Sequence, residues 1–343
     1  MSLLVYGANG FTGRLVAELA SSRGEKPLLA GRSADKVRPL AERLGLPWRA
    51  FPLEAPDLAG ARAVLHCAGP FSLTSRPMVD ACLRAGAHYL DITGEVSVFE
   101  SIYARDAEAK ERGVVLMPGT GVDVVPSDCL AAMLKERLPG AVRLELALTS
   151  RGPPSAGTTK TAVEHLGSGG LARRGGKLVP VPLAHATRDV PFSHRTMRAM
   201  AIPWGDVSSA WRSTGIPDIT VYLGASRTLM KLAKLTPLVA PLLRIGGLRR
   251  FVQRQIEKRV PGPTAEQRAR GRVHFWGRAT DASGNAVEAT LDIPEGYSFT
   301  AEAALACAGR VLAGGVAPGA WTPAQAFGAT FVTTLPGVSF RVA

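Results

Sequence analysis

The sequence has few of the residues that build disulfide, zinc or dithiol centres. Its 343 residues include four cysteines, which stand far apart in apolar runs and form no CxxC pair. This pattern argues against a disulfide framework and against a zinc or dithiol redox site. The six histidines also lack the spacing of metal ligands. We therefore expect reduced, buried thiols and no bound metal.

Long apolar runs are also missing. The segment that comes closest to a long apolar run is residues 229–243. It is interrupted by Lys231, Lys234, Pro237 and Pro241, so we expect no transmembrane helix. The sequence opens directly on an apolar strand-like run at residues 2–6, so we expect no signal peptide. Together with the cysteine pattern, these features predict a cytoplasmic protein.

Acidic residues are scarce in one segment of a chain whose net charge is +13. Residues 227–259 hold nine Lys or Arg and a single acid, Glu257, with apolar residues at helical spacing between them. Such a basic amphipathic segment can lie on an anionic membrane surface, cover the entrance for a lipid-like substrate, or dock on its own domain with a solvated basic face. We find no nucleic-acid-binding motif, so we expect no nucleic-acid partner.

Strand-like and helix-like segments alternate through the first 117 residues. This alternation predicts an α/β fold with a doubly wound parallel sheet. The expected strands are 3–6, 27–30, 49–51, 63–67, 88–91 and 114–117, and the expected helices are 13–22, 34–44, 77–85 and one within 98–112.

The pattern changes after Gly119. A helix starts at Pro126, and β-like segments follow at 143–150, 178–182, 218–224, 272–281 and 286–293, the last two joined by a hairpin turn. We expect a second α+β domain on a mixed or antiparallel sheet. The predicted division is residues 1–125, then 126–299 including the basic segment 227–259, and then a C-terminal helix and tail, 300–343, that returns to the first domain.

A glycine-rich turn lies between the first strand and the first helix, where a dinucleotide-binding Rossmann domain places its phosphates. Glycines allow a tight turn and a close approach to a pyrophosphate, and the helix N-terminus offers N–H groups and a positive dipole end. The spacing is GxxGxxG, so the glycines alone do not distinguish the families that use it. The predicted cofactor-binding residues of this turn are Gly7, Asn9, Gly10, Phe11, Thr12 and Gly13.

The end of the second expected strand favours NADP(H) over NAD(H). An NAD site usually has an acidic residue there for the ribose 2′-hydroxyl, whereas this chain has Arg32 followed by Ser33. An arginine can pair with a 2′-phosphate through charge-assisted hydrogen bonds, and the serine adds a donor.

Three more loops follow expected strands and should meet at the same edge of the sheet, where ligands of such folds bind. The first is expected to lie against the nicotinamide half and consists of Cys67, Ala68, Gly69, Pro70 and Phe71. The others supply Glu95 and Asp123, our candidate catalytic proton donors, although either carboxylate can equally cap a helix or fix a loop. Asp91 fits better as a loop cap.

Several motifs together resemble one family. YGANGFTGRLVAELA, CAGPF, DACLRAGAHYLDITGE, PGTGVDVVPSDCLA and GYSFTAEAAL are similar to segments of saccharopine dehydrogenase-like NADP-binding oxidoreductases, in the branch related to bacterial trans-acting enoyl reductases. The resemblance implies a Rossmann domain and a mixed-sheet second domain that often forms homodimer contacts. Short-chain dehydrogenases share the glycine spacing, but their Tyr-x-x-x-Lys pair is absent, because no tyrosine here has a lysine four positions on.

The resulting functional hypothesis is an NADP(H)-dependent oxidoreductase that transfers a hydride to or from a hydrophobic or lipid-like small molecule, with enoyl reduction as the favoured reaction. Two alternatives stay open. One is a non-catalytic nucleotide-binding protein at a membrane surface. The other is an oxidoreductase acting on an imine, as in true saccharopine reductases.

Overall fold

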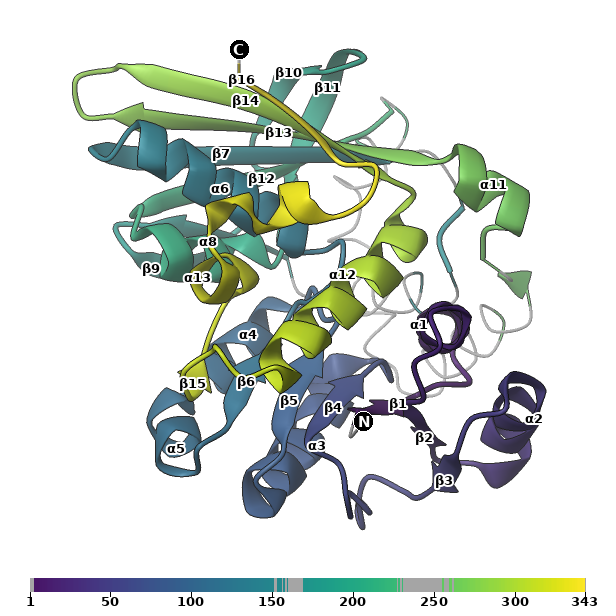
Figure 1. Cartoon of the computed structure of the whole chain (residues 1–343). Helices are drawn as coiled ribbons and strands as arrows, with labels where there is room; N and C mark the ends of the chain where they lie inside the picture. The colour runs from purple at the N-terminus through teal and green to yellow at the C-terminus, as the bar shows by residue number, and fades with distance from the viewer. Residues whose placement is uncertain are drawn as a thin grey trace. The chain divides into compact units, whose positions relative to one another are not determined.

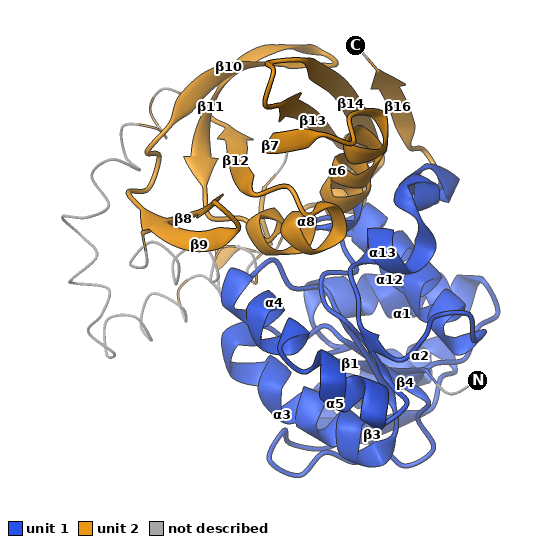
Figure 2. Cartoon of the chain, turned by 90° about the vertical axis from the view of Figure 1, so that its left-hand side faces the viewer, with its two compact units in different colours: residues 1–125, 297–336 blue, residues 126–296, 337–343 orange. Residues whose placement is uncertain are grey.

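The computed structural model describes residues 3–150, 153–155, 169–226 and 262–342, with single residues at 157, 159, 228, 230, 255, 259 and 260. Contacts divide the chain into two compact units (Figure 2). Unit 1 comprises Met1–Val125 and Tyr297–Pro336, and unit 2 comprises Pro126–Gly296 and Gly337–Ala343. The predicted basic segment 227–259 lies almost entirely outside the described residues.

The sheet of unit 1 has seven parallel strands in the order β15-β6-β5-β4-β1-β2-β3 (Figure 1). Apart from β15, this is the strand order of dinucleotide-binding doubly wound folds, in which the direction of winding reverses between β1 and β4. The predicted fold class is therefore confirmed. The strands are β1 (Leu3–Tyr6), β2 (Leu28–Gly31), β3 (Trp48–Ala50), β4 (Ala63–His66), β5 (His88–Asp91), β6 (Val115–Met117) and β15 (Gly319–Ala320).

Helices cover both faces of this sheet. Strands β1 and β4 are buried at every position, as expected for parallel strands packed on two sides. Because parallel crossovers are right-handed, the helices before and after the reversal lie on opposite faces. On one side are α1 (Phe11–Ser22) and α2 (Ala34–Leu44), and on the other are α3 (Phe71–Ala85), α4 (Val96–Tyr103) and α5 (Asp106–Glu111).

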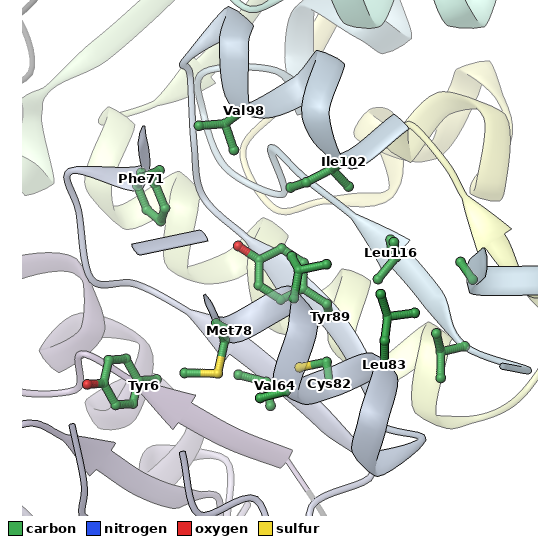
Figure 3. Close-up of a cluster of buried hydrophobic side chains, with 14 of the residues drawn as sticks. Tyr6, Val64, Phe71, Met78, Cys82, Leu83, Tyr89, Val98, Ile102 and Leu116 are labelled. Atoms are coloured by element: carbon green, nitrogen blue, oxygen red, sulfur yellow. The ribbon is translucent and has the colours of Figure 1, made fainter. Parts of the chain in front are cut away.

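A hydrophobic core between α3 and the sheet supports the strands whose carboxyl ends carry the site loops. Side chains of α3, among them Met78, Cys82 and Leu83, meet Val64 of β4 and Tyr89 of β5 (Figure 3). These residues are all at most 2% exposed. The loops that leave the strand ends are therefore anchored on a close-packed layer.

Helix α3 begins six residues earlier than the sequence predicts. The expected helix is 77–85. In the structure Pro77 lies inside the helix, which begins at Phe71. The loop after β4 is therefore short, and Phe71 is a helical residue, not a loop residue.

Unit 2 is built on a mixed sheet, as predicted. The strands follow the order β10-β11-β12-β7-β13-β14-β16, with β8 paired to β12 and β9 to β8, and only β12 and β7 run parallel. The strands are β7 (Ala141–Ser150), β8 (Gly170–Arg174), β9 (Lys177–Val181), β10 (Thr187–Phe192), β11 (Arg195–Ile202), β12 (Asp218–Gly224), β13 (Arg272–Asp281), β14 (Ala286–Pro294) and β16 (Ser339–Val342).

One face of this sheet packs against α6 (Val125–Arg137), and the fold depends on a glycine there. A Cβ atom at Gly277 of β13 would stand 2.7 Å from Leu134 of α6, so the glycine permits the close approach. Two further helices of the unit are α8 (Asp206–Thr214) and α11 (Ala265–Arg270).

The C-terminal segment divides between the units. Helices α12 (Gly296–Leu312) and α13 (Pro323–Phe327) and the 3₁₀ helix at Ala329–Thr334 contribute to unit 1, but β16 pairs with β14 in unit 2. The expectation that all of 300–343 returns to the first domain therefore fails for the last residues, because backbone pairing with β14 holds them.

Within the described residues no helix is long and apolar enough to cross a membrane. In the same part of the chain, no group of three His, Cys, Asp or Glu side chains is arranged to hold a metal ion.

Candidate dinucleotide site

The glycine-rich turn after β1 is held against two neighbouring strand ends. The N–H groups of Gly7 and Ala8 both donate to the carbonyl of Ala30, at 2.8 and 3.1 Å. Gly7 has a φ of +82°, and a Cβ atom there would lie 2.8 Å from the Cβ of Ala68. Only glycine suits this position, because it tolerates both the left-handed backbone and the contact with the loop after β4.

The start of α1 is arranged to receive an anion. Its N-cap is Gly10, which has no side chain to satisfy the first N–H groups, and the described structure places no acidic residue in the first turn. Unsatisfied N–H groups and the positive end of the helix dipole favour a phosphate at this point. Gly13 lets the helix start here, since a Cβ atom would stand 2.3 Å from the carbonyl oxygen of Gly7. Phe11 and Thr12 are the first two helical residues.

The residues predicted to bind the adenosine ribose come together beside this turn. The side-chain oxygen of Asn9 lies 2.9 Å from the position of a Cβ atom at Gly31, so it rests against the end of β2. Arg32 follows directly and is exposed. Ser33 is the N-cap of α2 but makes no side-chain cap hydrogen bond, which leaves its hydroxyl available to a ligand.

The loop after β4 forms the next wall. Cys67 and Ala68 are half-buried and lie against Gly7, and the Thr74 hydroxyl donates to the Ala68 carbonyl at 2.6 Å. Gly69 and Pro70 complete the loop before α3, joined by a cis peptide bond. Burial raises the pKa of the Cys67 thiol to about 12, with a smaller contribution from the charge of Asp91. Cys67 is therefore a neutral thiol at physiological pH and not a nucleophile.

Glu95 caps α3, the helix that follows this loop. Its two carboxylate oxygens accept the N–H groups of Phe71 and Ser72, each at 2.8 Å. The N-cap residue, Pro70, has no side-chain acceptor, so Glu95 supplies the missing one from the neighbouring strand end. These contacts fit the capping role of Glu95 and do not favour it as a proton donor.

Replacing Glu95 tests this role. Glu95→Gln keeps one acceptor but turns an amide NH₂ toward the second N–H, leaving a buried donor unsatisfied. We expect it to lower the free energy of unfolding by about 1–3 kcal/mol. Urea denaturation of Glu95→Gln and of Glu111→Gln, which alters an exposed residue of α5, measures the effect. Equal stabilities of the two variants would contradict the cap.

Asp91 joins the ends of β5 and β6. One carboxylate oxygen accepts the N–H groups of Thr93 and Gly119, at 3.0 and 2.8 Å, and the other accepts the Tyr89 hydroxyl at 2.8 Å. Burial raises the pKa of Asp91 to about 6, although these hydrogen bonds oppose the rise. Asp91 is thus a loop cap, and it places the loops of Glu95 and Asp123 side by side.

Asp123 is half-buried and lies beside the Glu95 loop. A Cβ atom at Gly94 would be 3.2 Å from the Cγ of Asp123, so glycine makes room for its carboxyl group. Burial raises the pKa of Asp123 to about 7, and the negative charge of Glu95 adds to the rise. A carboxyl group that is protonated near neutral pH can deliver a proton.

Sequence reasoning missed the first turn of α12, which also reaches this edge of unit 1. The Thr300 hydroxyl accepts the N–H of Val122 at 3.0 Å, and Gly121 leaves room for the Thr300 side chain. The ring of Tyr297 packs edge-to-face on Phe11 with centroids 4.9 Å apart. The motif GYSFTAEAAL contains both Tyr297 and Thr300, but it lies almost 300 residues after the glycine turn, and no sequence pattern shows that the two come into contact.

Comparison with protein-family models identifies a known domain that is similar to the part of the chain that carries this site. Residues 3–117 match the model of the saccharopine dehydrogenase NADP-binding domain. The predicted family resemblance and the preference for NADP(H) agree with this match, since the matched range includes the glycine turn, Arg32 and the Glu95 loop.

Curated relatives extend the similarity beyond the NADP-binding domain. The chain is 30% identical over 250 residues to the saccharopine dehydrogenase-like oxidoreductase of Mus musculus, an alignment that covers 62% of this chain and 58% of the relative. It is 36% identical over 149 residues to the trans-acting enoyl reductase of Mycobacterium leprae, covering 40% and 36%. The matched regions thus span less than two thirds of these relatives.

A solved structure shares the whole fold. Apo saccharopine dehydrogenase (L-Glu forming) from Saccharomyces cerevisiae superimposes with a TM-score of 0.67 over 99% of both chains, at 11% identity. At that identity the match concerns the fold alone. A parallel-sheet unit and a mixed-sheet unit of these folds therefore occur together in one known architecture.

Proposed function

We propose that the protein is an NADP(H)-dependent oxidoreductase that transfers a hydride to or from a hydrophobic substrate, with reduction of a C=C bond conjugated to a carbonyl group as the favoured reaction. The observation that carries the proposal is the N-terminus of α1, whose N-cap Gly10 has no side chain, beside Arg32 in the residues that match the saccharopine dehydrogenase NADP-binding domain. The similarity to an enoyl reductase supports the choice of reaction.

The residues present fit the cofactor. Gly7, Gly10 and Gly13 bring the backbone close to a diphosphate, and the first turn of α1 supplies N–H donors. Exposed Arg32 and the uncommitted Ser33 hydroxyl suit a 2′-phosphate. When bound, NADPH supplies the hydride, and the chain positions the reactants and excludes water.

Within this proposal Asp123 is the proton donor. Reduction of a C=C bond needs a proton at the carbon that does not take the hydride. Asp123 holds a proton on its carboxyl group near pH 7, whereas Glu95 is committed to α3. Glu95 therefore acts on the reaction indirectly, through the loop and through its charge.

Purified full-length protein tests the function directly. We expect NADPH to bind with a change in its fluorescence, and NADPH to be oxidised when unsaturated acyl thioesters or enones are added. Failure to bind NADPH or NADP⁺ would remove the proposal. Binding without turnover of enoyl or imine substrates would instead favour a non-catalytic nucleotide-binding protein. The homodimer and the peripheral membrane contact stay predictions.

Arg32 gives a test of nucleotide choice that does not disturb the fold. Its side chain is exposed and makes no ion pair with another described residue. We expect Arg32→Ala to raise the Kd for NADPH by about 10- to 100-fold, since one charge-assisted phosphate contact is lost, and to leave the Kd for NADH within about twofold. Titration calorimetry measures both.

The matched control is Arg38→Ala, which removes an equal charge from the exposed surface of α2. It should leave both affinities unchanged. If Arg32→Ala weakens NADPH and NADH equally, Arg32 does not recognise the 2′-phosphate.

A further inference from the structure

Helix α12 runs beside α1 across unit 1. Its last turn lies toward the amino edge of the sheet, because Arg62, just before β4, donates to the carbonyl of Leu312 at 3.1 Å. Its first turn lies at the opposite, carboxyl edge, where Thr300 accepts the N–H of Val122. Arg23 at the end of α1 pairs with Glu302. Two helix N-termini, of α1 and α12, therefore approach each other at the edge where ligands of this fold bind.

An aromatic pair joins these two first turns. Phe11 is the first residue of α1, and Tyr297 is the second residue of α12. Their rings meet at an interplanar angle of 73° with centroids 4.9 Å apart. Both side chains are half-buried, so neither ring is enclosed by unit 1. Tyr297 therefore contacts the first residue of the helix whose N-terminus is proposed to receive the diphosphate.

The position of α12 shows which half of a dinucleotide Tyr297 can reach. The ribose with the 2′-phosphate belongs beside Arg32, at the end of β2. Helix α12 instead contacts the loop after β6, through Val122 and Gly121, on the far side of the β1–β4 reversal. That side carries the loops of Gly69 and Glu95, against which the nicotinamide half is expected.

We propose that Tyr297 is a binding residue for the nicotinamide half of the dinucleotide, which it covers with its ring from α12. The inference rests on the proposed function and adds a cofactor contact from the C-terminal part of the chain. The aromatic ring packs on the apolar faces of the bound group, and Phe11 fixes its orientation. In this proposal two residues of the motif GYSFTAEAAL have defined roles. Tyr297 contacts the ligand, and Thr300 anchors the first turn of α12 to Val122.

The test compares two nucleotides of known chemistry. NADPH carries both halves, whereas 2′,5′-ADP carries only the adenosine with its two phosphates. We expect Tyr297→Ala to raise the Kd for NADPH about tenfold, the size expected for loss of an aromatic contact. The Kd for 2′,5′-ADP should stay within about twofold, and Tyr297→Phe should bind both as the wild type does.

Controls separate this contact from a structural role. Trp48→Ala removes a partly exposed aromatic side chain of β3 at the amino edge and should change neither affinity. If Tyr297→Ala weakens both nucleotides equally, or neither, the inference is overturned, whereas wild-type protein that binds neither nucleotide would overturn the proposed function itself. Thermal unfolding of each variant shows whether the fold is retained.

Discussion

Asp123→Asn is expected to lower kcat for substrate reduction by about 10²- to 10⁴-fold, the usual contribution of a positioned general acid. NADPH affinity should change little, because Asp123 lies in the loop after β6 and is not among the residues proposed to bind the diphosphate or the adenosine ribose. Steady-state kinetics together with NADPH titration measure the two effects separately. A variant that keeps its kcat would show that the proton comes from another group.

The pH dependence identifies the donor more strictly. Burial, reinforced by the charge of Glu95, raises the pKa of Asp123 to about 7, so its carboxyl group is protonated below that pH and ionised above it. Reduction by the wild type should therefore decline about tenfold per pH unit above pH 7. Asp123→Asn should lose this limb of the profile. Glu95→Gln should shift it to lower pH, because a neutral side chain no longer disfavours the carboxylate.

Asp123→Asn, which should slow the reaction, is expected to make the folded protein more stable at alkaline pH. The folded pKa of Asp123 lies above its ordinary value of 3.8, so between these two values the folded state holds the proton and the unfolded state does not. Stability contributed by this group is therefore lost as pH rises toward 7. Removing the charge should raise the melting temperature of Asp123→Asn above that of the wild type at pH 8 but not at pH 4. Thermal melts at both values test the sign.

The sequence alone suffices to place residues whose neighbours in space are also close in the chain. The glycine turn and Arg32 follow from a strand, a turn and a helix adjacent in the chain, and the structure places Asn9 of the turn against Gly31, directly before Arg32. Their roles in binding the cofactor stay predictions. The role of Glu95 needs a second strand end: only the pairing of β4 with β5 places it below the first turn of α3. The spacing of residues along the sequence does not show that Glu95 lies next to the N-terminus of α3.

Unit 2 shows where local preference misleads. Strand β11, Arg195–Ile202, is rich in Met, Arg and Ala, which favour helices, yet it pairs antiparallel with both β10 and β12. Strand β10 contains Pro191, which argues against a central strand, and it lies at the edge of the sheet. Neither strand was predicted, nor were β8, α8 and β16, because their conformations depend on neighbours distant in sequence.

Alanine at Gly10 and at Gly13 should separate binding from folding. At Gly10 the backbone has φ −72° and ψ 169°, which alanine adopts freely, and the new Cβ atom would meet only the Gly7 carbonyl oxygen, at 3.2 Å. The methyl group would instead occupy the space that a diphosphate needs. We therefore expect Gly10→Ala to melt within a few degrees of the wild type and to bind NADPH about 100-fold more weakly, a loss of about 2.7 kcal/mol.

At Gly13 the clash is with the chain itself. A Cβ atom would stand 2.3 Å from the Gly7 oxygen and 2.9 Å from the Cα of Ala8, so the turn and α1 must move apart. The turn is tied to Ala30 and packed on Ala68, and that displacement disturbs the sheet edge. Gly13→Ala should thus lose both thermal stability and NADPH affinity, because one added methyl group displaces the turn and the helix from each other. Gly309→Ala, inside helix α12 with open space around the new Cβ atom, is the control for adding a methyl group to a helical glycine. If Gly10→Ala binds NADPH as tightly as the wild type, no diphosphate lies on the first turn of α1.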